Sequence, residues 1–278
     1  MARNLATATE LVKFETMDNI CLIGINRPEK RNCVNHATAL QLVESFEKFE
    51  ANDALDVAVL HGIGGTFCAG YDLSEVASGD SNMKFWRDFL KHHRPMGPSM
   101  MRFTKPVIAA VTGYCVAGGL ELAAMCDMRC ADRTAVFGVF CRRFGVPLLD
   151  GGTVRLPHLI GQSRAMDMIL TGRPIDAGTA FEWGLVNRLS ETGTAFGEAV
   201  KLARSITRHP KECMRADRRS AYYGIYDAKS YQDAFDYELQ NAFHIIAQES
   251  KDGASKFVAG AGRSGKFGDL NTEPKSKL

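Results

Sequence analysis

The chain has 278 residues, of which 45% are hydrophobic and 24% charged, a balance typical of globular proteins and unlike that of disordered chains. Its 34 lysines and arginines and 32 aspartates and glutamates leave a net charge of +2, so the overall charge gives no attraction for nucleic acid. The length allows one large domain or two modest ones.

Strand and helix signals alternate along the first half of the chain. β-Prone runs at 11–15 and 20–26 flank the turn Met17-Asp18-Asn19 and predict a hairpin. Apolar runs predict further strands at 57–60, 107–111 and 128–131. Helical signals lie at 39–49, at 82–103 with breaks near Pro95 and Pro98, and at 118–125. This order predicts an α/β fold with parallel strands.

From about residue 163 onward the sequence is mainly helical. We therefore expect an α/β core over 1–200, a helical C-terminal region over 201–265 and a polar tail over 266–278. The most apolar long stretch, 106–126, is interrupted by Glu121 and three glycines, so we expect no membrane span.

The eight cysteines form neither a CxxC pair nor a Cys/His metal spacing, and Cys126 and Cys130 lack the second pair that a zinc site needs. We expect reduced thiols, no metal ion and no redox cofactor. At the other end of the chain, Ser276-Lys277-Leu278 matches the tripeptide that the peroxisomal import receptor binds. We therefore expect the import receptor as a partner and the peroxisome as the location.

Two glycine-bearing loops follow predicted strands, one at 67–73 and the other at 113–122. Glycine at a strand-to-helix turn frees backbone N–H groups to face a ligand, so two such loops side by side can form an oxyanion hole. The alternative is a pair of tight turns. A dinucleotide site is excluded because Phe67 stands where the third glycine of the motif beginning at Gly62 belongs, and neither a serine-hydrolase elbow nor a P-loop is present.

The segments Ala69-Gly70-Tyr71-Asp72 and Gly118-Gly119-Leu120-Glu121-Leu122 resemble the two signatures of the crotonase (enoyl-CoA hydratase/isomerase) superfamily. The resemblance covers roughly residues 10–262 and continues through 27–32, 105–111, 126–127, 137–138, 151–156, 170–173 and 184–186. It implies a spiral core of ββα units, a helical C-terminal trimerisation region and an acyl-CoA thioester as substrate. It also implies homotrimers, often paired into hexamers.

The resemblance assigns roles to residues at matching positions. The backbone N–H groups of Tyr71 and Gly118 would hold the thioester oxygen and stabilise an enolate. Lys30, Arg31 and Ala69 fall where the family contacts CoA, and Lys266 (or Arg263) is the residue near the C-terminus that would reach the CoA phosphate.

Acid–base chemistry is expected from Glu121, which matches one of the two catalytic glutamates of the hydratases and would act as general base. The alternative is an acid that merely favours a helix N-terminus. Cys141 stands where the second glutamate belongs, as a packed thiol rather than a nucleophile. Asp150, just before Gly151-Gly152-Thr153, either supplies the missing acid or base or caps the following helix.

The sequence therefore predicts an enzyme that hydrates 2-enoyl-CoA in fatty acid metabolism. Because Cys141 replaces the second acid, a double-bond (enoyl or dienoyl) isomerase, an acyl-CoA hydrolase and a decarboxylase of the same fold remain alternatives. A non-catalytic acyl-CoA-binding protein is the alternative from another class. The two glycine loops together with Glu121 favour an enzyme.

Overall fold

The computed structural model describes residues 10–78 and 83–262 and divides the chain into two compact units, one ending at Ala203 and the other beginning at Arg204. Lys266, Arg263 and the tripeptide Ser276-Lys277-Leu278 lie outside the described residues, so the predictions made for them stay predictions.

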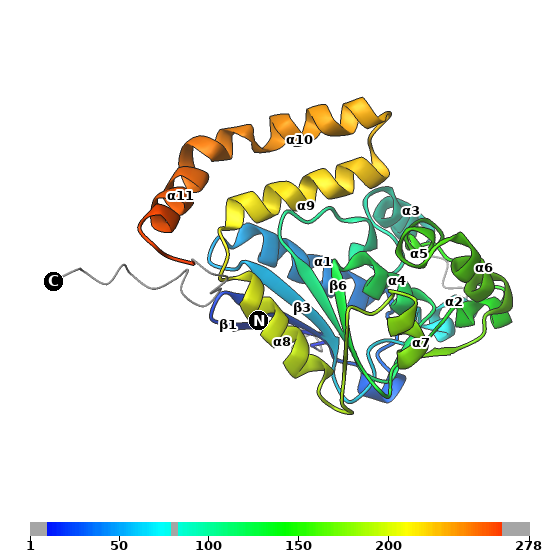
Figure 1. Cartoon of the computed structure of the whole chain (residues 1–278). Helices are drawn as coiled ribbons and strands as arrows, with labels where there is room; N and C mark the ends of the chain where they lie inside the picture. Colours follow the sequence, from blue (N-terminus) through cyan, green and yellow to red (C-terminus); the bar gives the residue numbers. More distant parts are fainter. Residues whose placement is uncertain (1–9, 79–82, 263–278) are drawn as a thin grey trace, which may run out of the picture. The chain divides into compact units, whose positions relative to one another are not determined.

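A six-stranded sheet forms the centre of the first unit, in the order β1-β2-β3-β4-β6-β9 (Figure 1). Its strands are β1 (Val12–Met17), β2 (Ile20–Ile25), β3 (Val57–Gly62), β4 (Val107–Val111), β6 (Met128–Asp132) and β9 (Arg188–Ser190). The strands β1 and β2 form the predicted antiparallel hairpin, and every other pair of neighbours is parallel. The α/β prediction is therefore confirmed, whereas the short edge strand β9 was not predicted.

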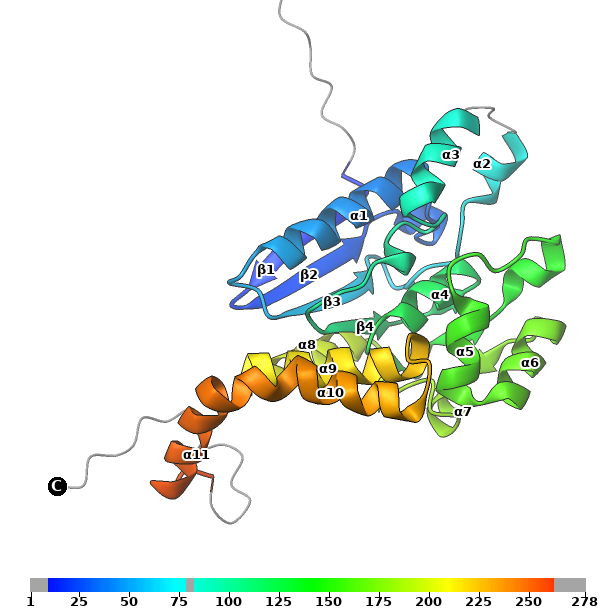
Figure 2. The same ribbon diagram turned by 90° about the horizontal axis from the view of Figure 1, so that it is seen from above.

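Both faces of this sheet are covered. Helix α1 (His36–Ala51) packs on β1 and β2, as Figure 2 shows, and buries Leu42, Phe46 and Phe49. On the other face His61 of β3 meets Phe196 of α8 (Ala195–Ile206), with 4.7 Å between the ring centres. Coverage on both sides explains why β2 and most of β3 and β4 read as continuous apolar runs.

The two glycine loops come together at the carboxyl ends of β3 and β4. Cys68 pairs with Cys115 in an isolated parallel bridge, and the Cys68 N–H donates to the Tyr114 carbonyl over 2.9 Å. Residue Cys115 belongs to β5 (Tyr114–Val116), which forms a small second sheet with β7 (Val136–Gly138) and β8 (Ile175–Asp176). The loops are therefore neighbours in space although they are far apart in the sequence.

Helices complete the first unit around these loops. They are α2 (Leu73–Ser78), α3 (Met83–His92), α4 (Gly118–Met125), α5 (Gly152–Ile160), α6 (Gln162–Thr171) and α7 (Ala177–Glu182). The helical signal over 82–103 ends earlier than predicted, at His92, and a short 3₁₀ helix, Pro98–Met100, follows the break at the prolines.

The second unit contains α9 (Lys211–Tyr226), α10 (Tyr231–Ile245), a π-helical turn (Ile246–Ser250) and α11 (Lys251–Val258). Helices α9 and α10 pair through stacked rings of Tyr223 and Tyr237, 3.8 Å apart, and through a hydrogen bond from the Asn241 amide to the Ala216 carbonyl. Large apolar side chains stay exposed along α10 and the π-helical turn, namely Tyr231, Phe235, Leu239, Phe243 and Ile246. In the described part of the chain, no helix is long and apolar enough to cross a bilayer.

Candidate active site

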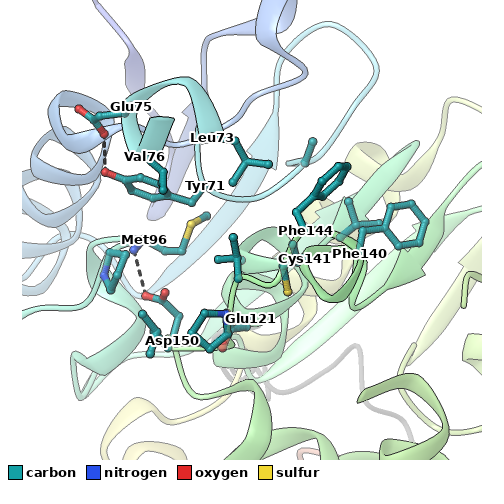
Figure 3. A pocket seen from close by; sticks show the side chains of 18 of the residues that line it. Tyr71, Leu73, Glu75, Val76, Met96, Glu121, Phe140, Cys141, Phe144 and Asp150 are labelled. Atoms are coloured by element: carbon teal, nitrogen blue, oxygen red, sulfur yellow. Dashed lines mark hydrogen bonds between the residues drawn. The ribbon is translucent and has the colours of Figure 1, made fainter. Parts of the chain in front are cut away.

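A pocket of about 1010 Å³ collects most of the predicted site residues (Figure 3). Its lining includes residues from both glycine loops, from α2 and from the segment between β7 and α5. Of the predicted residues it brings together Arg31, Ala69, Tyr71, Gly118, Glu121, Cys141 and Asp150. Lys30 does not line the pocket; it is exposed at the end of the 3₁₀ helix Pro28–Lys30.

The backbone of the first loop presses against the start of α4. A Cβ added at Gly70, whose φ is +101°, would lie 3.1 Å from the Gly118 nitrogen, and one at Gly119 would lie 2.1 Å from the Cys68 carbonyl oxygen. Gly118 is the first residue of α4, where the N–H has no acceptor within the helix and the helix dipole is positive. This geometry suits the predicted pairing of the Tyr71 and Gly118 N–H groups.

Ala117 turns the chain into α4 with φ of +53° and ψ of −127°, a conformation that a residue with a Cβ rarely adopts. Its N–H donates to the Gly138 carbonyl of β7 over 2.9 Å. The strain is therefore held by the small second sheet, at the residue that precedes the expected oxyanion donor.

Glu121 lies in the first turn of α4 and is only 2% exposed. Its Oε1 accepts hydrogen bonds from the backbone N–H groups of Asp150 (2.9 Å) and Gly152 (2.8 Å), so it binds the N-terminus of α5 rather than that of its own helix. Burial, and then the Asp150 charge, raise the pKa of Glu121 to about 7, against the two hydrogen bonds that lower it. Both protonation states are consequently populated near neutral pH.

Asp150 is also buried, 4% exposed, and its carboxylate points to a different segment. Its Oδ1 accepts hydrogen bonds from the Met96 N–H (2.9 Å) and the Ser99 hydroxyl (2.5 Å). Burial raises the pKa of Asp150, while these two bonds lower it. The alternative in which Asp150 caps α5 is wrong, because the cap residue is Gly151 and the Asp150 carboxylate bonds Met96 and Ser99 instead of the helix.

Arg155 of α5 fixes the backbone on both sides of this bond. Its guanidinium donates to the Asp150 carbonyl (2.9 Å) and to the Ser99 carbonyl (2.6 Å). Gly151, with φ of +93°, leaves room for this contact, since a Cβ there would lie 2.2 Å from Arg155 Nη1. Arg155 lies within the matched segment 151–156, but the sequence assigned it no role, and Ser99 carried no signal.

Met96 contacts both Asp150 and Gly118, the first residue of α4. Its backbone N–H donates to Asp150 Oδ1. Its side chain packs against Gly118, as a Cβ added there would lie only 2.5 Å from the Met96 sulfur. Gly118 therefore needs to be glycine as long as Met96 keeps this place.

Cys141 belongs to the 3₁₀ helix Phe140–Phe144 and lines the same pocket. Burial, and then the negative charge of Glu121, raise the pKa of this thiol, so it stays protonated at neutral pH. The position of the expected second acid thus faces the pocket but carries neither a carboxylate nor a reactive thiolate.

Basic groups lie at the side of the pocket where Arg31 and Tyr114 meet. The Arg31 guanidinium lies 5.6 Å from the Tyr114 ring centre, and the Arg31 carbonyl accepts the Ala69 N–H over 3.0 Å. Arg143, whose guanidinium lies 4.5 Å from the Phe140 ring centre, also lines the pocket and was not predicted. Arg31 and Arg143 thus place two positive charges at the pocket lining.

Residues 10–78 and 83–262 contain no group of three or more His, Cys, Asp and Glu side chains that could hold a metal ion. All eight cysteines are free thiols, as expected, and Cys213 is exposed.

Comparison with known proteins decides the family. Residues 15–261 match the family model described as enoyl-CoA hydratase/isomerase. The chain belongs to the enoyl-CoA hydratase/isomerase family. A mevalonyl-coenzyme A hydratase of Aspergillus fumigatus is 36% identical over 214 residues, covering 77% of this chain and 78% of that protein. A probable peroxisomal enoyl-CoA hydratase of Arabidopsis thaliana is 28% identical over 260 residues, or 93% of each chain.

Solved structures of the enoyl-CoA hydratase/isomerase family agree with this assignment. The enoyl-CoA hydratase of Mycobacterium tuberculosis H37Rv superposes with a TM-score of 0.82 at 35% identity, covering 89% of this chain and 95% of that one. The predicted crotonase fold is confirmed, and the predicted enzyme class is that of the family.

Proposed function

We propose that the protein hydrates 2-enoyl-CoA thioesters with Glu121 and Asp150 as an acid–base pair. The observation that carries the proposal is that these two buried carboxylates line one pocket with the N-terminal residue of α4. In it, the Tyr71 and Gly118 N–H groups hold the thioester oxygen, and each such donor is worth about 3–4 kcal/mol of barrier.

The reaction needs one ionised and one protonated carboxyl group. Burial raises the pKa of both groups, and the Asp150 charge raises that of Glu121 further, so a singly protonated pair is available near neutral pH. The ionised member takes a proton from water as the water oxygen bonds to the β-carbon. The electrons of the double bond move toward the thioester, forming an enolate at the two N–H donors. The protonated member then gives its proton to the α-carbon, which completes the addition of water.

The test follows the absorbance of the conjugated thioester with a panel of 2-enoyl-, 3-enoyl- and dienoyl-CoA esters, together with mevalonyl-CoA, the thioester named in the Aspergillus relative. Glu121→Gln and Asp150→Asn should each lower kcat by about 10²–10⁴-fold. The exposed Glu44→Gln and Asp53→Asn variants are the matched controls. Product formation without oxygen from labelled water would replace hydration by isomerisation. Binding of CoA esters without any turnover would replace it by a binding role.

CoA binding by Arg31, Ala69 and Lys30, with Lys266 at the phosphates, is part of the same proposal. The position of Arg31 and Ala69 in the pocket lining supports it. We expect Arg31→Ala to raise KM more than it lowers kcat, because the contact with CoA is the same in the ground state and the transition state. No metal ion or redox cofactor takes part in the proposed reaction.

Localisation and assembly also belong to the proposal. Ser276-Lys277-Leu278 and the name of the Arabidopsis relative support import into the peroxisome. A fluorescent fusion ending in this tripeptide should enter peroxisomes, and the same fusion without Leu278 should not. The exposed apolar residues of α10 support a homotrimer or homohexamer, which light scattering on the purified protein measures.

A further inference from the structure

Tyr71 and Glu75 form a polar pair in a largely apolar part of the pocket wall (Figure 3). The Tyr71 hydroxyl donates a hydrogen bond to Glu75 Oε2, and the backbone N–H of His36 donates to the same oxygen over 2.9 Å. Figure 3 shows the apolar side chains of Leu73, Val76 and Met96 on the same side of the pocket as Tyr71, and Leu90 and Pro95 also line the pocket.

Glu75 keeps unused capacity to accept hydrogen bonds. Both hydrogen bonds to its carboxylate end on Oε2, and among the side chains described, those of 10–78 and 88–262, none donates to Oε1 or forms an ion pair with Glu75. Glu75 is half-buried. A plain alkyl chain packed against it would take water from the carboxylate without replacing the lost hydrogen bond, which is unfavourable. A hydroxyl group at the same place would supply the missing donor.

The place of the pair relative to the thioester follows from Tyr71 itself. The backbone N–H of Tyr71 belongs to the expected oxyanion hole, while its hydroxyl, at the far end of the same side chain, binds Glu75. A thioester held at this N–H can therefore reach the pair only with atoms several bonds away from its carbonyl. The apolar lining that includes Leu73 and Val76 fits the acyl arm, whereas we expect the CoA arm at Arg31 and Ala69.

We propose that the pocket selects acyl-CoA thioesters that carry a hydroxyl group on the acyl chain beyond the reacting double bond, with Glu75 accepting its hydrogen bond. This inference rests on the proposed function, because it assumes that the thioester lies at Tyr71 and Gly118. The same carboxylate repels acyl chains that end in a carboxylate.

The experiment compares three thioesters of equal chain length: pent-2-enoyl-CoA, its 5-hydroxy derivative and glutaconyl-CoA. Because a hydrogen bond to a charged group is worth a factor of about 10–100, kcat/KM should be at least about 10-fold higher for the hydroxylated ester than for the alkyl ester. Glutaconyl-CoA should be the poorest of the three.

Glu75→Gln removes the charge with little change of shape. The preference for the hydroxylated ester should fall severalfold, and the discrimination against glutaconyl-CoA should largely disappear. Glu44→Gln, an exposed position on α1, is the matched control and should leave both ratios unchanged. Because the readout is a ratio of substrates, a general loss of activity does not imitate it.

Binding of the saturated esters, pentanoyl-CoA and 5-hydroxypentanoyl-CoA, to the wild-type protein is measured by calorimetry, which needs neither turnover nor a variant. Tighter binding of the hydroxylated ester without hydration of any ester would refute the proposed function and leave the selectivity standing. Hydration of the alkyl ester at an equal or higher kcat/KM would overturn the selectivity alone. Unchanged ratios in a folded Glu75→Gln variant would do the same.

Discussion

Replacing Glu121 by glutamine should change how stability depends on pH. A carboxyl group whose pKa is higher in the folded than in the unfolded chain binds more protons in the native state, so its contribution to stability is lost as pH rises. For Glu121 the window runs from 4.5, the ordinary value, to about 7 in the folded protein. At about 1.4 kcal/mol per pH unit, this interval corresponds to about 3 kcal/mol.

The assay is urea unfolding of the wild type and of Glu121→Gln at several pH values from 5 to 8 and at one protein concentration. Glutamine keeps an oxygen for the N–H groups of Asp150 and Gly152, but it cannot ionise. Relative to the variant, the wild type should lose about 2–3 kcal/mol of unfolding free energy across this range, most of it below pH 7. Titrating groups that do not interact with Glu121 contribute equally to both proteins and cancel in the difference, whereas the contribution of Asp150, whose charge acts on Glu121, belongs to the measured effect.

Glu44→Gln, an exposed position on α1 that lies outside the pocket, is measured in the same way as the matched control. A constant difference between the wild type and Glu121→Gln would contradict this prediction, because it would mean that burial and the Asp150 charge do not raise the pKa of Glu121.

Three further predictions concern the surroundings of the acid pair. Arg155→Met should lower kcat and move the limb of the pH–rate profile that reports Asp150 to higher pH, because the guanidinium charge lowers the pKa of Asp150. Arg155→Lys keeps the charge and should leave this limb near its original pH. An unchanged profile in Arg155→Met would mean that Arg155 neither positions Asp150 nor acts on its pKa. Cys141→Ala should lower kcat by far less than the about 10²–10⁴ expected on loss of a general acid, and a loss of that size would assign the second acid role to Cys141. Gly119→Ala should lower the melting temperature and kcat/KM together, because the new Cβ would overlap the Cys68 carbonyl oxygen. Such overpacking lowers the free energy of unfolding by about 1–3 kcal/mol. Unaltered values would show that the two loops can move apart without loss of stability or activity.

Local signals were enough to predict the glycine loops and most strands. The sequence marks the turn before α2 and the start of α4 because few residues besides glycine fit where one backbone approaches another, as at Gly70 and Gly119. The Met17-Asp18-Asn19 turn likewise fixed the hairpin of β1 and β2.

The hydrogen-bond partners of Asp150 could not be predicted in the same way. An aspartate before Gly-Gly-Thr carries the chemistry of a helix cap, and only the folded chain shows that its carboxylate instead binds Met96 and Ser99, more than 50 residues away in sequence. The hydrogen bond from Arg155 to the Ser99 carbonyl could not be predicted either, because it joins residues that are far apart in the sequence. The fold can thus be predicted from periodicity and turns, whereas the hydrogen bonds that orient the acids depend on tertiary contacts.

Glu121, Asp150 and Met96 are joined in series, each side chain holding the backbone of the next residue in the series, and Met96 in turn packs on Gly118. Because Gly118 and Glu121 both belong to α4, these contacts form a closed ring. A shift of residues 96–99 would therefore move Asp150, Glu121 and Gly118 together. None of the short segments quoted above for the family resemblance includes residues 96–99. Redesign of the acyl pocket should therefore leave residues 96–99 unchanged. Glu75 and Cys141 are the positions to vary, because neither takes part in this ring of contacts.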